Sequence, residues 1–328
     1  MSVILIIIIV LALLFDFSNG IHDSSNVVAT MISSRALSPR LALGMTALAN
    51  FFGPFVFGVA VATTIGHEIV AAETINEQVL LAALVSAIGW NLLTWYLGFP
   101  SSSSHALVGG FIGAVVIGAG WRAILMGGLL KILIALFASP IVGFIIGYLI
   151  LRITYLLSWN ATPRINSFFR QGQIFTALAL ALSHGTNDAQ KTMGIITLAL
   201  VTGGFISTFV VPLWVILACA TMIALGTALG GWKLIRTLGG KFYKIRPVDG
   251  FASQLASAAV ILTASLIGGP VSTTQVVSSA IMGVGAAERA NKVRWGVAQE
   301  IAMAWLLTIP ATALVAAGVY ALLIRFIP

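Results

Sequence analysis

Charged residues are scarce in this chain. Asp, Glu, Lys and Arg make up 8% of its 328 residues and 59% are hydrophobic, whereas soluble domains carry about 25% charged residues. No segment is long and polar enough to form a soluble domain. Apolar stretches recur from end to end, and each reaches roughly the 18 residues needed to cross about 30 Å of hydrocarbon. The composition therefore predicts an all-α polytopic membrane protein.

Cysteine is almost absent as well. The single Cys219 excludes an intramolecular disulfide and is expected to serve packing. His22, His105 and His184 lie in or beside polar motifs, but no two have ligand spacing on one helix, so no structural metal site and no cofactor are predicted. The 17 Lys and Arg against 9 Asp and Glu are expected to reflect loops on the inner face of a membrane, with no nucleic-acid partner.

A short polar stretch interrupts the first apolar run and later returns. It is NGIHDSSN at residues 19–26, and SHGTNDAQK at residues 183–191 is similar to it. Aligning the glycines of the two stretches places Asp23 opposite Asp188. A glycine followed three residues later by an aspartate, twice in apolar surroundings, indicates an internal duplication.

A second pair of motifs is rich in hydroxyl groups. PSSSSHALVGG at residues 100–110 matches PVSTTQVVSSA at residues 270–280, so both pairs keep their order and spacing. This pattern is typical of a transporter built from two repeats. We therefore divide the chain into a first membrane repeat (1–152), a cytoplasmic connector (153–171) and a second membrane repeat (172–328), which together form one transport domain.

Each repeat is expected to contain a broken first helix and a re-entrant helical hairpin. The first segment, residues 2–35, is too long for one straight span and carries the polar stretch inside it, so two half-helices are predicted. The apolar run after the serines, residues 105–118, is too short to span the membrane. A hairpin whose serine tip lies within the membrane, beside a cavity, accounts for this length.

The charges of the loops predict the orientation of the repeats. Loop 66–78 is acidic and has no Lys or Arg, whereas its counterpart, loop 231–250, is basic, and equivalent loops of opposite charge indicate inverted repeats. With the N-terminus outside, most basic residues lie inside, as the positive-inside rule requires. These residues are Arg35, Arg40, Arg152, Arg164, Arg170, Lys233, Arg236, Lys241, Lys244, Arg246, Arg289, Lys292 and Arg294.

Asp23 and Asp188 require an explanation, because a carboxylate in hydrocarbon costs about 2.5–3.5 kcal/mol on insertion scales. Combined with amide and hydroxyl oxygens, these carboxylates suit Na⁺; alternatively, they take up a proton. The competing interpretation is a structural hydrogen bond at a helix break. Recurrence at equivalent positions of both repeats favours a cation site.

The hydroxyl-rich motifs indicate anion binding. Ser101–Ser104 and Ser272–Thr274 come shortly after a proline, at the start of a predicted helix. Such a helix offers unpaired N–H groups and the positive end of its dipole, which together bind anions. Ordinary N-capping is the competing interpretation, but a cap needs only one hydroxyl, and these runs supply four and three.

Two residues beside the aspartates add charge or a proton carrier. His22 directly precedes Asp23, so a proton relay is possible in principle. Lys191 stands where repeat symmetry expects an asparagine; it supplies charge to the anion, fills a cation site with its ammonium group, or forms a salt bridge to Asp188 three residues earlier. The other charges within the membrane, for which structural pairing is expected, are Asp16, Lys131 and Glu300.

These motifs resemble those of the inorganic phosphate transporter (PiT) family. The family's duplicated signature is close to GANDVAN, and this chain has GIHDSSN and GTNDAQK. The family's hydroxyl-rich hairpin motif is similar to PSSSSHALVGG and PVSTTQVVSS. The similarity covers essentially the whole chain and is strongest to the compact, low-affinity bacterial phosphate permeases.

The resemblance implies an inverted-repeat fold, phosphate bound between two hairpin tips, cations beside the aspartates, and a homodimer in a prokaryotic inner membrane. Residues expected to bind or couple the cation are Asp23, Asn26, Asn187, Asp188 and His22. Residues expected to bind phosphate are Ser102, Ser103, Ser104, Ser272, Thr273, Thr274 and Lys191. Residues expected to assist are His105, Gln275 and Ser101.

Two departures from the family signature bear on the coupling ion. His22 stands where the signature has Asn, and Lys191 stands where it has the second Asn. Each change removes an oxygen ligand from an expected Na⁺ site. We therefore hypothesise coupling to H⁺, or to fewer Na⁺ ions than in members with both full signatures.

The expected function is cation-coupled phosphate symport by alternating access. The same fold suits sulfate or thiosulfate as the substrate, and a passive anion channel is a more remote alternative. An intramembrane enzyme with a serine nucleophile and His105 as base is disfavoured, because no Asp in the hairpins orients that histidine and Gln275 replaces it in the second repeat.

Overall fold

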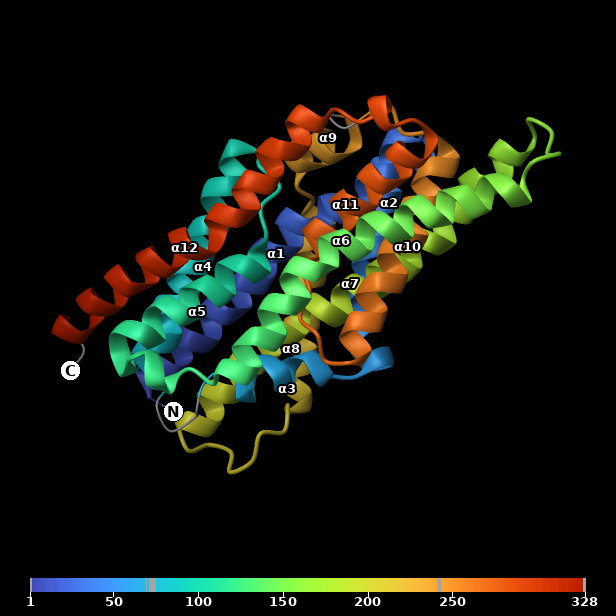
Figure 1. Cartoon of the computed structure of the whole chain (residues 1–328). Helices are drawn as coiled ribbons and strands as arrows, with labels where there is room; N and C mark the ends of the chain where they lie inside the picture. The colour runs from blue at the N-terminus through green and yellow to red at the C-terminus, as the bar shows by residue number, and fades with distance from the viewer. Residues whose placement is uncertain (1, 69, 71–74, 241–242, 327–328) are drawn as a thin grey trace.

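The computed structural model describes residues 2–68, 70, 75–240 and 243–326, and Figure 1 shows that helices dominate it. Part of the acidic loop 66–78 and Lys241 of the basic loop lie outside the described residues. The α-helices are α1 (Val3–Ser33), α2 (Pro39–Phe57), α3 (Ala60–His67), α4 (Glu77–Leu97), α5 (Ser103–Ala119), α6 (Met126–Leu157), α7 (Ile165–Thr202), α8 (Leu213–Leu229), α9 (Trp232–Gly240), α10 (Pro247–Leu266), α11 (Thr273–Glu288) and α12 (Trp295–Phe326).

The predicted membrane protein is confirmed by the length and composition of these helices. Among the described residues, six helices are long and apolar enough to cross a membrane: α1, α2, α4, α6, α10 and α12. Large apolar side chains on their outer faces, such as Leu314 on α12 and Ile141 on α6, are exposed. In a soluble protein this would be costly, but in a bilayer these side chains face lipid.

The predicted break in the first helix of each repeat is wrong. α1 is one helix of 31 residues and α7 is one of 38. Their polar side chains do not interrupt the backbone ladder: Ser24 and Ser25, for example, donate to carbonyl oxygens three residues earlier. Because α1 extends about 46 Å at 1.5 Å per residue, it is long enough to cross the hydrocarbon and still reach beyond it.

The glycines of the two polar stretches serve close helix crossings instead of breaks. A Cβ on Gly20 would lie 2.3 Å from the backbone oxygen of Ile223 in α8. A Cβ on Gly185 would lie 2.1 Å from the backbone oxygen of Asn50 in α2. Small residues let helix backbones approach in this way in membranes, so the duplicated glycine positions two equivalent crossings.

The two expected helical hairpins are present. α4 and α5 form the first and are joined through residues 98–102, and α10 and α11 form the second and are joined through residues 267–272. In each, the first helix is long enough to span a membrane and the second is short, with 17 residues in α5 and 16 in α11. The N-terminal ends of α5 and α11 both lie in the middle of the molecule (Figure 1).

The packing partners of the helices are duplicated. α1 packs on α8 as α7 packs on α2, and α5 packs on α12 as α11 packs on α6. This exchange agrees with two repeats, while the inverted relation and the repeat boundaries stay predictions. Of the predicted connector, only residues 158–164 are outside helices, since α6 ends at Leu157 and α7 begins at Ile165.

An ion cluster joins the base of the second hairpin. Arg246 at the start of α10 pairs with Asp249 and with Glu288 at the end of α11, and Lys292 also contacts both carboxylates. The ammonium of Lys292 lies 4.6 Å from the ring centroid of Tyr243. Burial raises the pKa of the Tyr243 hydroxyl well above its usual value, with nearby carboxylates adding to the effect. The cluster fixes the ends of α10 and α11 relative to each other.

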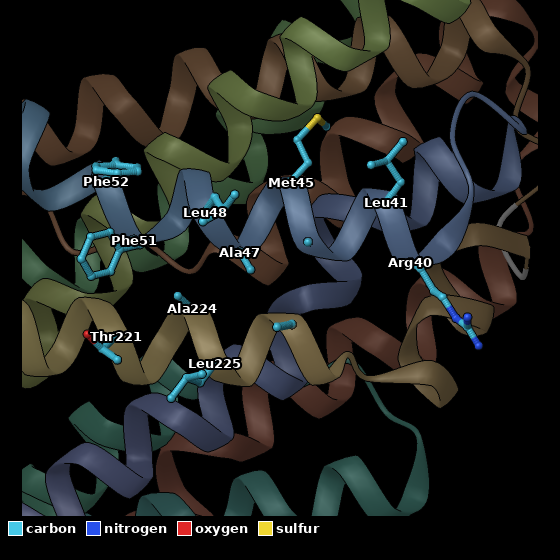
Figure 2. A pocket seen from close by; sticks show the side chains of 12 residues that line it. Arg40, Leu41, Met45, Ala47, Leu48, Phe51, Phe52, Thr221, Ala224 and Leu225 are labelled. Carbon is cyan, nitrogen blue, oxygen red and sulfur yellow. The ribbon is translucent and has the colours of Figure 1, made fainter.

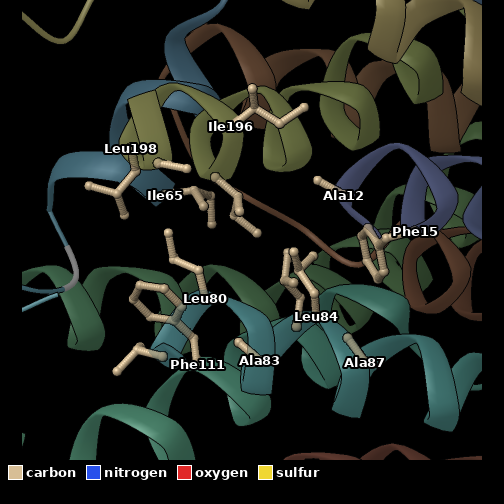
Figure 3. Close-up of a cluster of buried hydrophobic side chains, with 14 of the residues drawn as sticks. Ala12, Phe15, Ile65, Leu80, Ala83, Leu84, Ala87, Phe111, Ile196 and Leu198 are labelled. Atoms are coloured by element: carbon tan, nitrogen blue, oxygen red, sulfur yellow. The ribbon is translucent and has the colours of Figure 1, made fainter. Parts of the chain in front are cut away.

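A large cluster of buried apolar side chains lies where α1, α4, α5 and α7 meet. Figure 3 shows Phe15 of α1 near Leu84 of α4, and Leu80 near Phe111 of α5, with Ile196 of α7 opposite. Lipid is as apolar as these side chains, so their burial stabilises the fold through close packing and not through removal from water. Helix contacts without gaps are therefore the main source of stability here.

We predict that Gly113→Ala destabilises the protein. A Cβ at this position of α5 would lie 2.1 Å from the backbone oxygen of Ala313 in α12, and overpacking costs roughly 1–3 kcal/mol. The thermal unfolding midpoint in detergent should fall. Gly89→Ala in α4 is the control, because nothing lies within 4 Å of its added carbon; equal midpoints for the two variants would contradict the packing described here.

Candidate substrate and coupling-ion site

The motif residues meet at the centre of the molecule, where side chains of α1 and α7 are hydrogen-bonded to the starts of α5 and α11. All of the predicted site residues are buried, and Asp23 and Asp188 have no exposed surface. Asp23 and Asn26 of α1, and Asp188 and Lys191 of α7, are hydrogen-bonded to the hairpin tips. The duplicated motifs of the two halves thus form one site and not two.

Asp23 accepts hydrogen bonds from both halves of the chain. Its Oδ1 accepts from Thr274 Oγ1 at 2.7 Å and from Asn26 Nδ2 at 2.9 Å. Its Oδ2 accepts from Ser103 Oγ at 3.3 Å. The Nδ1 atom of His22 lies 3.1 Å from Oδ1. One carboxylate therefore holds hydroxyl groups of both hairpin tips.

Asp188 is the counterpart on α7, and it has a cationic partner. Thr273 Oγ1 donates to its Oδ2 at 2.8 Å, and Lys191 forms an ion pair with its Oδ1. The same ammonium group donates to Ser104 Oγ at 2.6 Å and to the backbone oxygen of Val271 at 2.9 Å. Lys191 therefore connects Asp188 to both tips, and the predicted salt bridge is confirmed.

His184 belongs to this site, although the motif analysis did not assign it there. Its Nε2 lies 3.0 Å from Asp188 Oδ2 and 3.9 Å from Asp23 Oδ2. One ligand atom from each of these three residues lies within 4.8 Å of the others, a spacing that can hold a cation. The sequence could have indicated His184 through its spacing of four residues from Asp188, which places both side chains on one face of α7.

The proton on the His184 ring can be assigned from its other neighbour. Asn50 donates through Nδ2 to Thr227 at 2.9 Å, so its Oδ1 faces His184 Nδ1 at 3.2 Å. A carboxamide oxygen only accepts, and Nδ1 must therefore carry a hydrogen. Nε2 then faces two carboxylates, an arrangement that is favourable only with a proton or another cation between them.

Some hydroxyls have a structural role. Ser102 caps α5 by accepting from the His105 amide at 3.1 Å, and Ser272 caps α11 by accepting from the Gln275 amide at 3.4 Å. The alternative of N-capping thus holds for these two serines. Ser101 donates to Thr94. Of the hydroxyls that follow each cap, those of Ser103, Thr273 and Thr274 donate to the carboxylates. The Ser104 hydroxyl donates to the backbone oxygen of Val271 instead.

The remaining predicted residues lie beside the central network. His105 and Gln275 contact each other, at 3.3 Å between their Nε2 atoms, which links equivalent positions of the two hairpins. Asn187 donates to Ser265 Oγ at 2.9 Å and to the Gly269 oxygen. The structure therefore does not bring Asn187 to the carboxylates, although it is adjacent to Asp188 in sequence.

An apolar groove of about 840 Å³ lies away from this site, between α2 and α8 (Figure 2). Leu41, Leu48 and Phe52 line it on α2, and Leu225 lines it on α8. Its surface is almost entirely apolar, and exposed leucines flank it. Arg40 lines one end of the groove, and the rest of its surface suits lipid chains better than an anion.

Comparisons with known proteins identify the family of the chain. The sequence profile of the phosphate transporter family matches residues 19–316. A probable low-affinity inorganic phosphate transporter of Bacillus subtilis is 47% identical over 97% of this chain and 96% of its own length. One of Rhizobium meliloti with the same description is 45% identical over 95% and 94%.

The fold also matches a solved structure. It is described as the sodium-dependent phosphate transporter, and it superimposes with a TM-score of 0.91 and 26% identity over 100% of both chains.

We predict that Lys191→Met destabilises the protein by roughly 3–5 kcal/mol, because it leaves the buried carboxylate of Asp188 without its cation. Adding Asp188→Asn should recover most of that loss, since neither charge then remains. Thermal unfolding in detergent measures both.

Lys131→Met is the matched control. Its partner Glu68 is 2.8 Å away, but both side chains are more than one-third exposed, so the loss of stability should be at most about 1 kcal/mol. Additive effects of the Lys191 and Asp188 changes would contradict the pairing.

Proposed function

Because the chain belongs to the phosphate transporter family, we propose that it is a secondary active transporter, in which inorganic phosphate crosses the membrane together with a cation by alternating access. Proteins of this family are transporters and not enzymes. The observation that carries the proposal is the direct bonding of the tip hydroxyls to the two carboxylates.

This bonding supplies a physical reason for coupling. Ser103 and Thr274 donate to Asp23, and Thr273 donates to Asp188. A bound phosphate needs these same donors. In a buried site charge-assisted hydrogen bonds are strong, so an ionised carboxylate competes with phosphate for each hydroxyl. A cation that neutralises the carboxylate removes the competitor and frees the hydroxyl for the anion.

The rest of the phosphate site follows from the same geometry. With their hydroxyls released, α5 and α11 present first-turn N–H groups and the positive ends of two helix dipoles to one place. Lys191, already bonded to Ser104, adds a full positive charge. Release of the cation restores the carboxylates as competitors, and phosphate is then expelled. Cation and phosphate therefore enter and leave together.

The residues around the carboxylates favour H⁺ as the coupling ion. His22 and His184 contact them, and Lys191 occupies a position where a further oxygen ligand for Na⁺ is expected. The similar solved structure is that of a sodium-dependent protein, which makes Na⁺ the alternative. Phosphate is favoured over sulfate because a protonated phosphate can donate to Asp23 or Asp188, whereas sulfate has no proton to give.

We also propose the placement of the molecule. Figure 1 places the start of α2, the α6–α7 connection and the start of α10 toward one end, and the two chain termini toward the other. The first end carries the basic loops, which supports an N-terminus outside the cell. The bacterial relatives support a prokaryotic inner membrane, and the homodimer rests on the family resemblance.

The test is uptake of labelled phosphate into proteoliposomes, with a pH gradient or a Na⁺ gradient imposed separately and sulfate as competitor. We expect accumulation under the pH gradient, and none after Asp23→Asn, because a neutral side chain cannot exchange the cation. Accumulation under the Na⁺ gradient alone would show that the coupling ion is Na⁺ and not H⁺. Equilibration without accumulation under either gradient would indicate a passive channel. Transport of sulfate in place of phosphate would contradict the proposal that phosphate is the substrate.

A further inference from the structure

Asp16 is a buried carboxyl group that the coupling mechanism above does not use. It lies on α1, seven residues before Asp23, and has no exposed surface. Thr192 Oγ1 of α7 donates to its Oδ1 at 2.5 Å. Its Oδ2 has no hydrogen-bond partner in the part of the chain that the structure describes. The expected structural pairing of Asp16 is therefore a hydrogen bond to Thr192, and it engages only one of the two carboxylate oxygens.

Apart from the Thr192 hydroxyl and the weak thiol donor of Cys219, the groups around Asp16 supply no partner for a negative charge. From the elements packed against α1, the titratable groups that face it are Asp188 and Lys191 of α7 and the thiol of Cys219 on α8. The ammonium of Lys191 is engaged by Asp188, Ser104 and the Val271 oxygen. Thr192 is the residue after Lys191, so Asp16 is bonded to the helix turn that carries the site.

These surroundings fit Asp16 as a neutral carboxylic acid. An isolated ionised carboxylate in an apolar interior is so costly that it is neutralised instead. Na⁺ is a hard cation that prefers several oxygen ligands, and a thiol is a poor substitute for one. A proton needs only the free Oδ2. The environment therefore suits a carboxylic acid that gives up its proton when water or charge reaches it.

A polar line connects Asp16 with the central site. Asp16, Asn19 and Asp23 follow at intervals of three and four residues, so they share one face of α1. Asn19 is also buried, and neither its amide nitrogen nor its amide oxygen has a partner among the described residues. Unpartnered buried amides are rare and call for an explanation. Water molecules that are hydrogen-bonded to this amide, and that pass a proton between Asp16 and Asp23, give one.

We propose that Asp16 is a second proton-binding residue of the transport cycle, separate from the carboxylates that hold the tip hydroxyls. In the step, Oδ2 of the carboxylate takes one proton from a hydronium ion on one side, so that an O–H bond of the hydronium breaks as the O–H bond of the carboxylic acid forms. That bond breaks in turn when the proton passes to a water molecule on the other side. The inference rests on the proposed phosphate symport and identifies a residue that carries its coupling ion.

The test separates phosphate exchange from net uptake. Exchange of labelled for unlabelled phosphate needs binding and alternating access, whereas accumulation under a pH gradient also needs the proton to come off. We expect Asp16→Asn to keep exchange and to lose accumulation. Asp16→Glu should keep both. So should Glu300→Gln, the control, because Glu300 is exposed on α12.

The outcomes distinguish the two proposals. Accumulation by Asp16→Asn at the wild-type level would overturn the role of Asp16, and so would wild-type uptake that a pH gradient does not drive. Failure of the wild-type protein to exchange phosphate at all would instead overturn the proposed function.

A second variant gives a readout that a structural role would not change. Thr192→Val removes the donor that stabilises the ionised carboxylate of Asp16. The proton is then held more tightly, and the pH at half-maximal uptake should move upward. An infrared difference spectrum should also contain a carboxylic-acid C=O band that Asp16→Asn lacks. An unshifted pH profile, or a band that persists in Asp16→Asn, would overturn the inference.

Discussion

Hydrogen bonds from the hairpin hydroxyls to two buried carboxylates are the interaction on which the rest of the structure depends. Asp23 holds Ser103 of the first hairpin and Thr274 of the second, so the two halves cannot separate without breaking these bonds. The short helices α5 and α11 start at the centre of the molecule because their tips end here. The close crossings at Gly20 and Gly185 bring α1 and α7 into reach. Binding and conformation are thereby linked through the same few groups.

These hydrogen bonds are strong because the surroundings of the site are apolar. In an apolar interior an unpaired polar group costs more than a pair gains in water, so nearly every central side chain is bonded to another. Buried side-chain atoms without a partner among the described residues occur on several helices, and those of Asp16, Asn19 and His22 lie on α1, within or just before its polar motif.

The sequence predicted the two hairpins and most of the residues that meet at the candidate site, because a charge or a run of hydroxyls in hydrocarbon is a strong signal. The prediction failed where local and tertiary effects compete. The polar stretches predicted helix breaks, but Ser24 and Ser25 bond to their own helix and leave it intact. His184 was not assigned to the site because its partners include Asp23 and Asn50, on other helices. Asn187, expected among the cation ligands, turns toward α10.

The number of phosphate ions bound by each chain is the most direct test of a single site shared by the two halves. Equilibrium binding of labelled phosphate to the purified protein should give one per chain. Ser103→Ala and Thr273→Ala, from opposite hairpins, should each weaken that one site by roughly tenfold or more, since a hydrogen bond to a charged group contributes about 1.5–3 kcal/mol. Two phosphates per chain, with each substitution affecting only one of them, would contradict the account.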